Sequence, residues 1–140
     1  MSRIMAFDYG TKRIGIAVTD PLQLIATGLD TVHPQDILVF LSKYLQTEAV
    51  ECFVVGEPKR MDGSASQVEP HIKGFINLLK KNFPNIPAER MDERFTSKMA
   101  SASIAQSGLN KLDRQNKERI DIVSATIILQ SYLEKKAQGF

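Results

Sequence analysis

Residues 4–20 have the sequence IMAFDYGTKRIGIAVTD, and this stretch decides the fold. Two apolar segments, residues 3–9 and 13–19, are rich in Ile, Val and Phe, which favours β-strands. Gly10 and the two polar residues after it are typical of a hairpin turn. Asp8 nevertheless places a carboxylate inside the first strand, so its position needs a chemical reason.

The composition is that of an ordinary soluble globular protein, with 43% apolar and 24% charged residues. A chain of 140 residues suits one domain, residues 1–140, with a single core. The formal net charge is only +2, although a local basic patch can still bind nucleic acid. Cys52 is the only cysteine, the N-terminus is no signal peptide, and no segment reaches the roughly 18 apolar residues of a membrane span. We therefore expect a cytoplasmic protein with no membrane partner.

Further elements follow from local patterns. A third strand over 24–32 is expected to close an antiparallel meander. The sequence HPQD then indicates a helix start, with His33 as the candidate cap and Pro34 at the first helical position. Residues 50–56, VECFVVG, form a continuous apolar run, which is typical of a strand covered on both faces.

The second half of the chain is predicted to alternate between helices and a strand. Ser66 and Glu69 match a capping box, so a helix is expected from there to about Asn82. The elements after it are a strand over 86–91, a helix capped by Thr96 or Ser97 that ends near Gly108, and a final helix over about 117–136.

This order predicts an α/β fold with a five-stranded mixed sheet. The first three strands form the meander, and the later strand–helix–strand alternation indicates right-handed parallel crossovers. Strands one, four and five should be parallel, with strands two and three antiparallel on one edge and helices on both faces. That is the ribonuclease-H-like arrangement.

Each parallel strand is expected to deliver an acid to the same edge of the sheet. Asp8 ends the first strand, Glu57 follows the fourth, and Asp92 and Glu93 follow the fifth. The carboxyl ends of parallel strands are where sites form in open α/β sheets. A sheet built only for stability has little reason to gather like charges there.

Asp121 adds a further carboxylate, in the final helix. Its surroundings, RIDIVSATIILQSYL, are apolar almost all the way round, which predicts a buried helix. Burying an unpaired charge costs several kcal/mol, so Asp121 needs a cation. That cation is either an Arg or Lys side chain or a metal ion.

The candidate ligands favour Mg²⁺ or Mn²⁺ over zinc. They are all oxygen donors, and the two histidines, His33 and His71, are far apart in the sequence. Two such ions about 3.5–4 Å apart would clamp the attacking and leaving oxygens of a phosphodiester.

Four motifs in order give a family resemblance over nearly the whole chain. The stretches FDYGTKRIGIAV, VVGEPKRMDGS, DERFT and KERIDIVSATIILQSYL resemble the YqgF-type, or RuvX-like, family. These ribonuclease-H-like proteins are described as nucleases that mature the small-subunit ribosomal RNA precursor, and also as Holliday junction resolvases. The resemblance implies that Asp8, Glu93 and Asp121 bind the metal and are catalytic.

The chain departs from this family at two positions. Glu57 stands where the family usually has an aliphatic residue, and related resolvases place a catalytic Glu at the end of that strand. Glu57 therefore competes with Glu93 for the second ligand position, or it is a solvated loop acid. Ser124 stands where the family often has Ala.

Several polar residues near this edge have a structural alternative. Asp92 is expected to pair with Arg94, and Thr96 to cap a helix. The basic residues that could contact phosphates are Lys12, Arg13, Lys59, Arg60, Arg94 and Lys117.

The leading hypothesis is a metal-dependent nuclease that acts on structured RNA, in 5′ maturation of the small-subunit ribosomal RNA precursor. Branched DNA is the alternative substrate, and its resolution usually needs two active sites related by a two-fold axis. A non-catalytic nucleic-acid-binding module is the third hypothesis. An actin-like sugar kinase is rejected, because it needs two such domains. We expect a monomer or weak homodimer.

Overall fold

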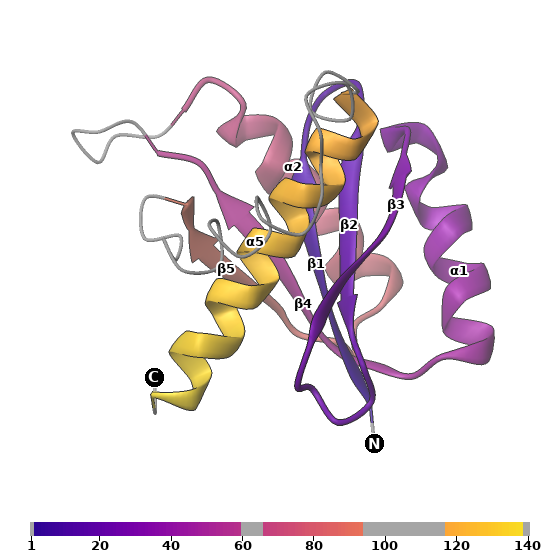
Figure 1. Cartoon of the computed structure of the whole chain (residues 1–140). Helices are drawn as coiled ribbons and strands as arrows, with labels where there is room; N and C mark the ends of the chain where they lie inside the picture. The colour runs from indigo at the N-terminus through magenta and orange to yellow at the C-terminus, as the bar shows by residue number, and fades with distance from the viewer. Residues whose placement is uncertain (1, 60–65, 94–116, 139–140) are drawn as a thin grey trace.

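The computed structural model describes residues 2–59, 66–93 and 117–138 (Figure 1). The elements are β1 (Arg3–Tyr9), β2 (Ile14–Thr19), β3 (Ala26–Val32), the 3₁₀ turn η1 (Pro34–Asp36), α1 (Ile37–Thr47), β4 (Val50–Glu57), α2 (Glu69–Asn82), β5 (Ala88–Asp92) and α5 (Lys117–Ala137). The helix predicted near 97–108 and the polar loop after it lie outside the described residues.

The five strands form one sheet in the order β3-β2-β1-β4-β5. β1 pairs parallel with β4, and β4 parallel with β5, while β2 is antiparallel to both β1 and β3. The predicted mixed sheet, with its antiparallel meander on one edge, is confirmed. The carboxyl ends of β1, β4 and β5 therefore lie along one edge, and Asp8 stands opposite Gly15 of β2.

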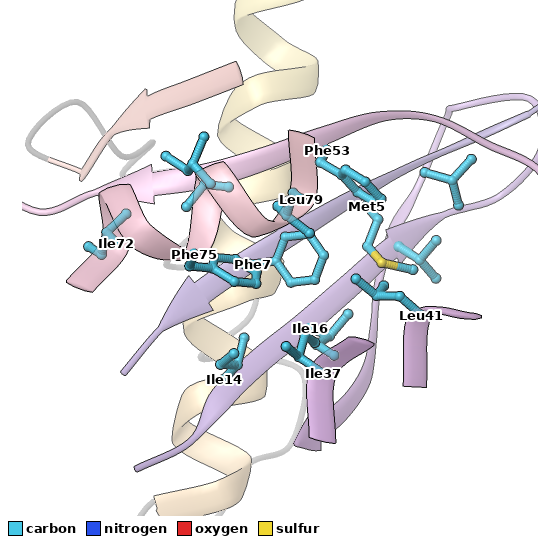
Figure 2. Packing of buried hydrophobic residues seen from close by; sticks show 14 residues of the cluster. Met5, Phe7, Ile14, Ile16, Ile37, Leu41, Phe53, Ile72, Phe75 and Leu79 are labelled. Atoms are coloured by element: carbon cyan, nitrogen blue, oxygen red, sulfur yellow. The ribbon is translucent and has the colours of Figure 1, made fainter. Parts of the chain in front are cut away.

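Helices cover both faces of the sheet (Figure 1). Side chains of β1, β2 and β4 pack against α1 and α2 in the larger apolar cluster, shown in Figure 2. On the opposite face α5 packs through Ala125, Ile128 and Leu129, all buried, against the alternate side chains of β1 and β4. Because neighbours along a strand point to opposite faces, Asp8 follows Ile4 and Ala6 on the α5 face.

The α5 helix is less buried than the sequence predicts. Its sheet-facing side is fully covered, but Ile122, Val123 and Ile127 are only partly buried. In the part of the chain that the structure describes, no helix is long and apolar enough to cross a membrane.

The capping box predicted at Ser66 is wrong. α2 begins at Glu69 with Val68 as its N-cap and no side-chain cap. The Glu69 carboxylate instead forms an ion pair with Arg90 of β5, whose Nη2 lies 2.9 Å from Oε1. A partner of opposite charge on the neighbouring strand is stronger than a neutral backbone N–H, so the side chain points to the sheet.

Other predicted boundaries move by two or three residues, including the start of β5, which was expected at residue 86 and lies at Ala88. β3 begins at Ala26 because the Asp20 carboxylate accepts hydrogen bonds from the backbone N–H groups of Leu24 and Ile25, both 2.8 Å, which extends the turn. His33 does cap the next element, since its Nδ1 accepts from the backbone N–H of Gln35, but the first turn is 3₁₀ and α1 starts at Ile37.

Candidate active site

Asp8 is the acid around which the site is built. Burial, together with the negative charges of Glu93 and Asp121, raises the pKa of Asp8 from 3.8 to about 7. A hydrogen bond with Ser124 opposes this rise. Folding therefore brings acids from β1, from the end of β5 and from α5 within electrostatic reach of one another.

Glycines on both neighbouring strands make room for the other two acids. A Cβ on Gly15 of β2 would lie 2.1 Å from the backbone oxygen of Asp121. A Cβ on Gly56 of β4 would lie 3.2 Å from both Cδ and Oε2 of Glu93. Side chains at these two positions would push Asp121 and Glu93 away from the sheet edge.

Glu93 follows β5 directly and lies over β4 beside Gly56. Burial raises the pKa of Glu93, and so does the charge of Asp92, while the positive charge of Arg90 lowers it. The carboxylate of Glu93 is therefore partly shielded from water, and a nearby cation would stabilise its charged form.

Asp121 has a cationic partner in the structure, and it is an arginine, one of the two kinds of cation that the sequence left open, although sequence reasoning did not identify which one. The Nε of Arg13 donates to Oδ2 of Asp121 at 2.8 Å. Arg13 was expected to contact phosphates and Asp121 to bind metal, so this pair joins two predicted site residues directly. Arg13 and Asp121 are 108 positions apart in the sequence, so no local sequence pattern could indicate that they pair.

Ser124 is a second residue whose role the sequence did not indicate. It lies three positions after Asp121, on the same face of α5, and its side chain hydrogen-bonds to Asp8. The spacing of three residues between Asp121 and Ser124 in a predicted helix could have indicated that both side chains lie on the same face.

Glu57 belongs to a different group of charges. Its Oε1 lies 3.4 Å from Nζ of Lys59 and its Oε2 lies 3.7 Å from Nη1 of Arg90. Lys59 also lies 3.7 Å from Oδ2 of Asp92. The lysine that was expected to meet phosphates therefore pairs with the two acids that flank it.

The remaining basic residues are only partly described. Lys12 is exposed at the hairpin turn beside Arg13. Arg60 and Arg94 lie outside the described residues, so the expected Asp92–Arg94 pair does too. The side chain of Lys117, at the start of α5, is also outside the description.

Comparisons with known proteins fit this geometry. A family model described as "RuvX: Holliday junction resolvase" matches residues 2–135. The chain belongs to the RuvX family. A RuvX relative from Christiangramia forsetii, named "Putative pre-16S rRNA nuclease", is 54% identical over 95% of this chain and 98% of its own. A protein of the same name from Phocaeicola vulgatus is 54% identical over 97% and 98%.

The fold of this RuvX protein also matches a solved structure. The solved structure titled "T. thermophilus RuvC in complex with Holliday junction substrate" superposes on this chain with a TM-score of 0.58, over 96% of both chains. At 17% identity this likeness establishes the ribonuclease-H-like fold. RuvX proteins are nucleases, so the chain is a hydrolase of phosphodiester bonds and its partner is a nucleic acid.

The donor set of this RuvX protein fits a divalent cation, which nucleases of this kind use in general. Oxygen-rich carboxylate sites suit such ions. The pKa of Asp8 is raised by burial and then by repulsion from Glu93 and Asp121, and a dication would offset both effects. Within residues 2–59, 66–93 and 117–138, no three His, Cys, Asp or Glu side chains are placed to hold a metal ion as they stand. Of the three acids, Asp121 is the one that forms an ion pair with an arginine, Arg13.

Proposed function

We propose that this RuvX protein is a cytoplasmic, single-domain nuclease that uses Mg²⁺ or Mn²⁺ to cut structured RNA, in 5′ maturation of the small-subunit ribosomal RNA precursor. Asp8, Glu93 and Asp121 would be its catalytic and metal-binding acids. The observation that carries this proposal is that the carboxylate of Asp8 is buried within electrostatic reach of Glu93 and Asp121, and burial first and then these two charges raise its pKa to about 7. Three segments far apart in the sequence bring their carboxylates to one edge.

Each residue has a task at this edge. A bound divalent ion would polarise the scissile phosphate and favour deprotonation of the attacking water. Asp8, Glu93 and Asp121 would hold it, and Ser124 would fix the rotamer of Asp8 through its hydrogen bond. Lys12 and Arg13 lie on the adjoining hairpin turn, where they would position the phosphate backbone.

Glu93 is preferred over Glu57 as the second acid. The charge of Glu93 acts on Asp8, whereas Glu57 is paired with Lys59 and Arg90. Glu57 would then stabilise the end of the sheet and take no part in the chemistry.

The RNA substrate is supported by relatives more than 50% identical over nearly their full length, which carry the pre-16S rRNA nuclease name. Branched DNA is the second candidate substrate, favoured by the description of the family model. An RNA-cutting enzyme can act as a monomer, while junction resolution would call for a homodimer with two sites.

Replacing Asp8 by Asn tests the function. The D8N variant should cut precursor RNA slower by roughly two orders of magnitude or more in Mg²⁺ or Mn²⁺. It should bind the RNA at least as tightly in EDTA, because one negative charge facing the phosphates is gone. Single-turnover cleavage of a labelled precursor RNA and of a four-way DNA junction measures both substrates.

Glu57→Gln is the matched control, since it also changes a carboxylate to an amide at the same sheet edge. It should cleave like the parent. Equal cleavage by D8N and the parent contradicts the mechanism, and cleavage of the junction alone moves the substrate to branched DNA. Loss of activity in E57Q as large as in D8N would reassign the second acid.

A further inference from the structure

Arg13 is held in place by the tight turn between β1 and β2. The backbone N–H of Gly10 donates to the carbonyl oxygen of Arg13 at 2.9 Å. A Cβ on Gly10 would lie 2.8 Å from that oxygen, so the turn needs glycine there. The backbone of Arg13 is thus fixed, and its long side chain provides the freedom to reach different partners.

The ion pair that Arg13 makes is accessible to solvent. The side chains of Arg13 and Asp121 are 34% and 23% exposed. The contact uses Nε, and no acceptor for the terminal amino groups is found among the described residues. An arginine fork can hold a phosphate through those groups in bidentate fashion. Because both side chains remain partly exposed, water screens the pair, and a second anion can displace Asp121 from it.

We propose that Arg13 exchanges partners: it neutralises Asp121 in the free protein, and it moves to a substrate phosphate when nucleic acid binds, which frees Asp121 for the divalent ion. This inference rests on the proposed function and deepens it. Arg13 is then a positioning residue, which makes metal binding depend on substrate.

The charges at the site favour this exchange. A guanidinium and a divalent cation compete for the same Asp121 carboxylate, so the pair weakens metal binding while it lasts. An approaching phosphate offers Arg13 an anion in place of Asp121. Since linkage is reciprocal, nucleic acid should raise metal affinity by the same factor by which metal raises nucleic-acid affinity.

The competing explanation is that the Arg13–Asp121 ion pair is purely structural and serves to hold α5 against the hairpin. The hairpin and α5 already meet directly, however, because Gly15 packs against the backbone of Asp121 with no room for a Cβ. Ile128 and Leu129 anchor the same helix in the core. Arg13 is therefore not required to hold the helix against the sheet.

Titration calorimetry with Mn²⁺, in the absence of nucleic acid, tests the exchange. Arg13→Gln removes the competing cation, so its affinity for Mn²⁺ should rise by roughly two- to fivefold over the parent, the range set by the strength of exposed ion pairs. The same variant should bind a labelled stem-loop RNA more weakly in EDTA, with a salt slope smaller by about one phosphate contact. If the ion pair were purely structural, removing the Arg13 charge would not increase the affinity for Mn²⁺.

Arg3→Gln is the matched control. Arg3 makes a similar pair, with Nε 3.1 Å from Oε2 of Glu48, and Arg3 begins β1 while the site lies at the other end of that strand. Its Mn²⁺ affinity and RNA salt slope should equal those of the parent. Arg13→Met, which keeps the aliphatic stem, is a second uncharged variant should Arg13→Gln fold poorly.

Unchanged or weaker Mn²⁺ affinity in the Arg13 variants overturns the exchange, and so does an unchanged salt slope. If the parent binds Mn²⁺ and cuts RNA while these variants behave like it, only this inference fails. If neither parent nor variants bind Mn²⁺, the exchange and the proposed function fail together.

Discussion

Asp8 is the residue whose protonation differs most clearly between the folded and unfolded chain. The folded protein holds the proton more tightly, because burial and two neighbouring negative charges raise the pKa of Asp8 to about 7. This contribution to stability is fully present below the unfolded pKa of about 4 and is lost as the pH rises through about 7. The folded state at pH 8 therefore carries an electrostatic penalty at this residue.

The D8N variant should reveal that penalty. In EDTA at pH 8 it should be more stable than the parent by about 2–4 kcal/mol, because the amide cannot ionise. At pH 5 Asp8 is protonated in the folded parent but still mostly ionised in the unfolded chain, so the gap should shrink to roughly 1–2 kcal/mol. Urea denaturation at the two pH values measures both differences, and a gap that is the same at both would contradict the raised pKa.

The sequence predicted individual acids better than their partners. Strand ends indicated Asp8, Glu57, Asp92 and Glu93, and one charge in an apolar helix indicated Asp121. The family resemblance then singled out Asp8, Glu93 and Asp121, whose metal-binding role stays a prediction. The partner of Asp121 could not be predicted, because Arg13 lies 108 positions away and an isolated arginine in a turn has no distinguishing pattern. Glu57 and Lys59 were predicted as site residues because they follow the end of a parallel strand. The structure shows that they form an ion pair with each other.

At the scale of elements, the contact between the β1–β2 hairpin and α5 sets the position of Asp121. The close approach depends on Gly15, which is buried and stands opposite Asp8 in the register. The sequence shows this glycine only as a small residue in a strand. That a helix backbone passes over it follows from the tertiary structure.

Gly15→Ala should lower the free energy of unfolding by roughly 1–3 kcal/mol or more, because the new methyl group overlaps the Asp121 carbonyl and α5 must shift. Gly74→Ala, in α2, is the control. Nothing lies within 4 Å of its added Cβ, so this change should instead stabilise the protein by about 0.5–1 kcal/mol. Denaturant midpoints of both variants measure the two effects, and a neutral Gly15→Ala would contradict the close packing.

Element boundaries were predicted where local chemistry dominates and missed where distant groups compete. His33 acts as a cap as expected, although of the 3₁₀ turn that precedes α1, since the cap needs only the next two residues. Ser66 does not form its capping box, because Arg90 on another strand attracts the Glu69 side chain that the box requires.

For the whole molecule, the order of strands was predictable because only a few topologies are compatible with each connection between strands. Three strands without helices between them form a meander, and parallel strands need helical crossovers. The overall charge gives less information. A net charge of +2 cannot attract nucleic acid strongly, so binding must depend on the few cations beside the acidic edge.

Lys12→Gln tests that dependence. Lys12 is exposed on the hairpin turn, and its loss should reduce the slope of log K for RNA against log salt by about one. Lys43→Gln, at an exposed position of α1, changes the net charge equally and should leave the slope unchanged. Fluorescence anisotropy over a series of salt concentrations measures the slopes; equal reductions in both variants would mean that only net charge matters.

The long sequence separation of the Arg13–Asp121 contact has a consequence for the order of synthesis. A nascent chain that stops short of residue 121 already contains the hairpin and Asp8, yet it lacks the helix that covers that face of the sheet. Arg13 then has no Asp121 to contact, and the buried apolar side chains beneath α5 are open to water. During translation, therefore, the sheet face that carries Asp8 stays uncovered until α5 has left the exit tunnel and folded onto the sheet.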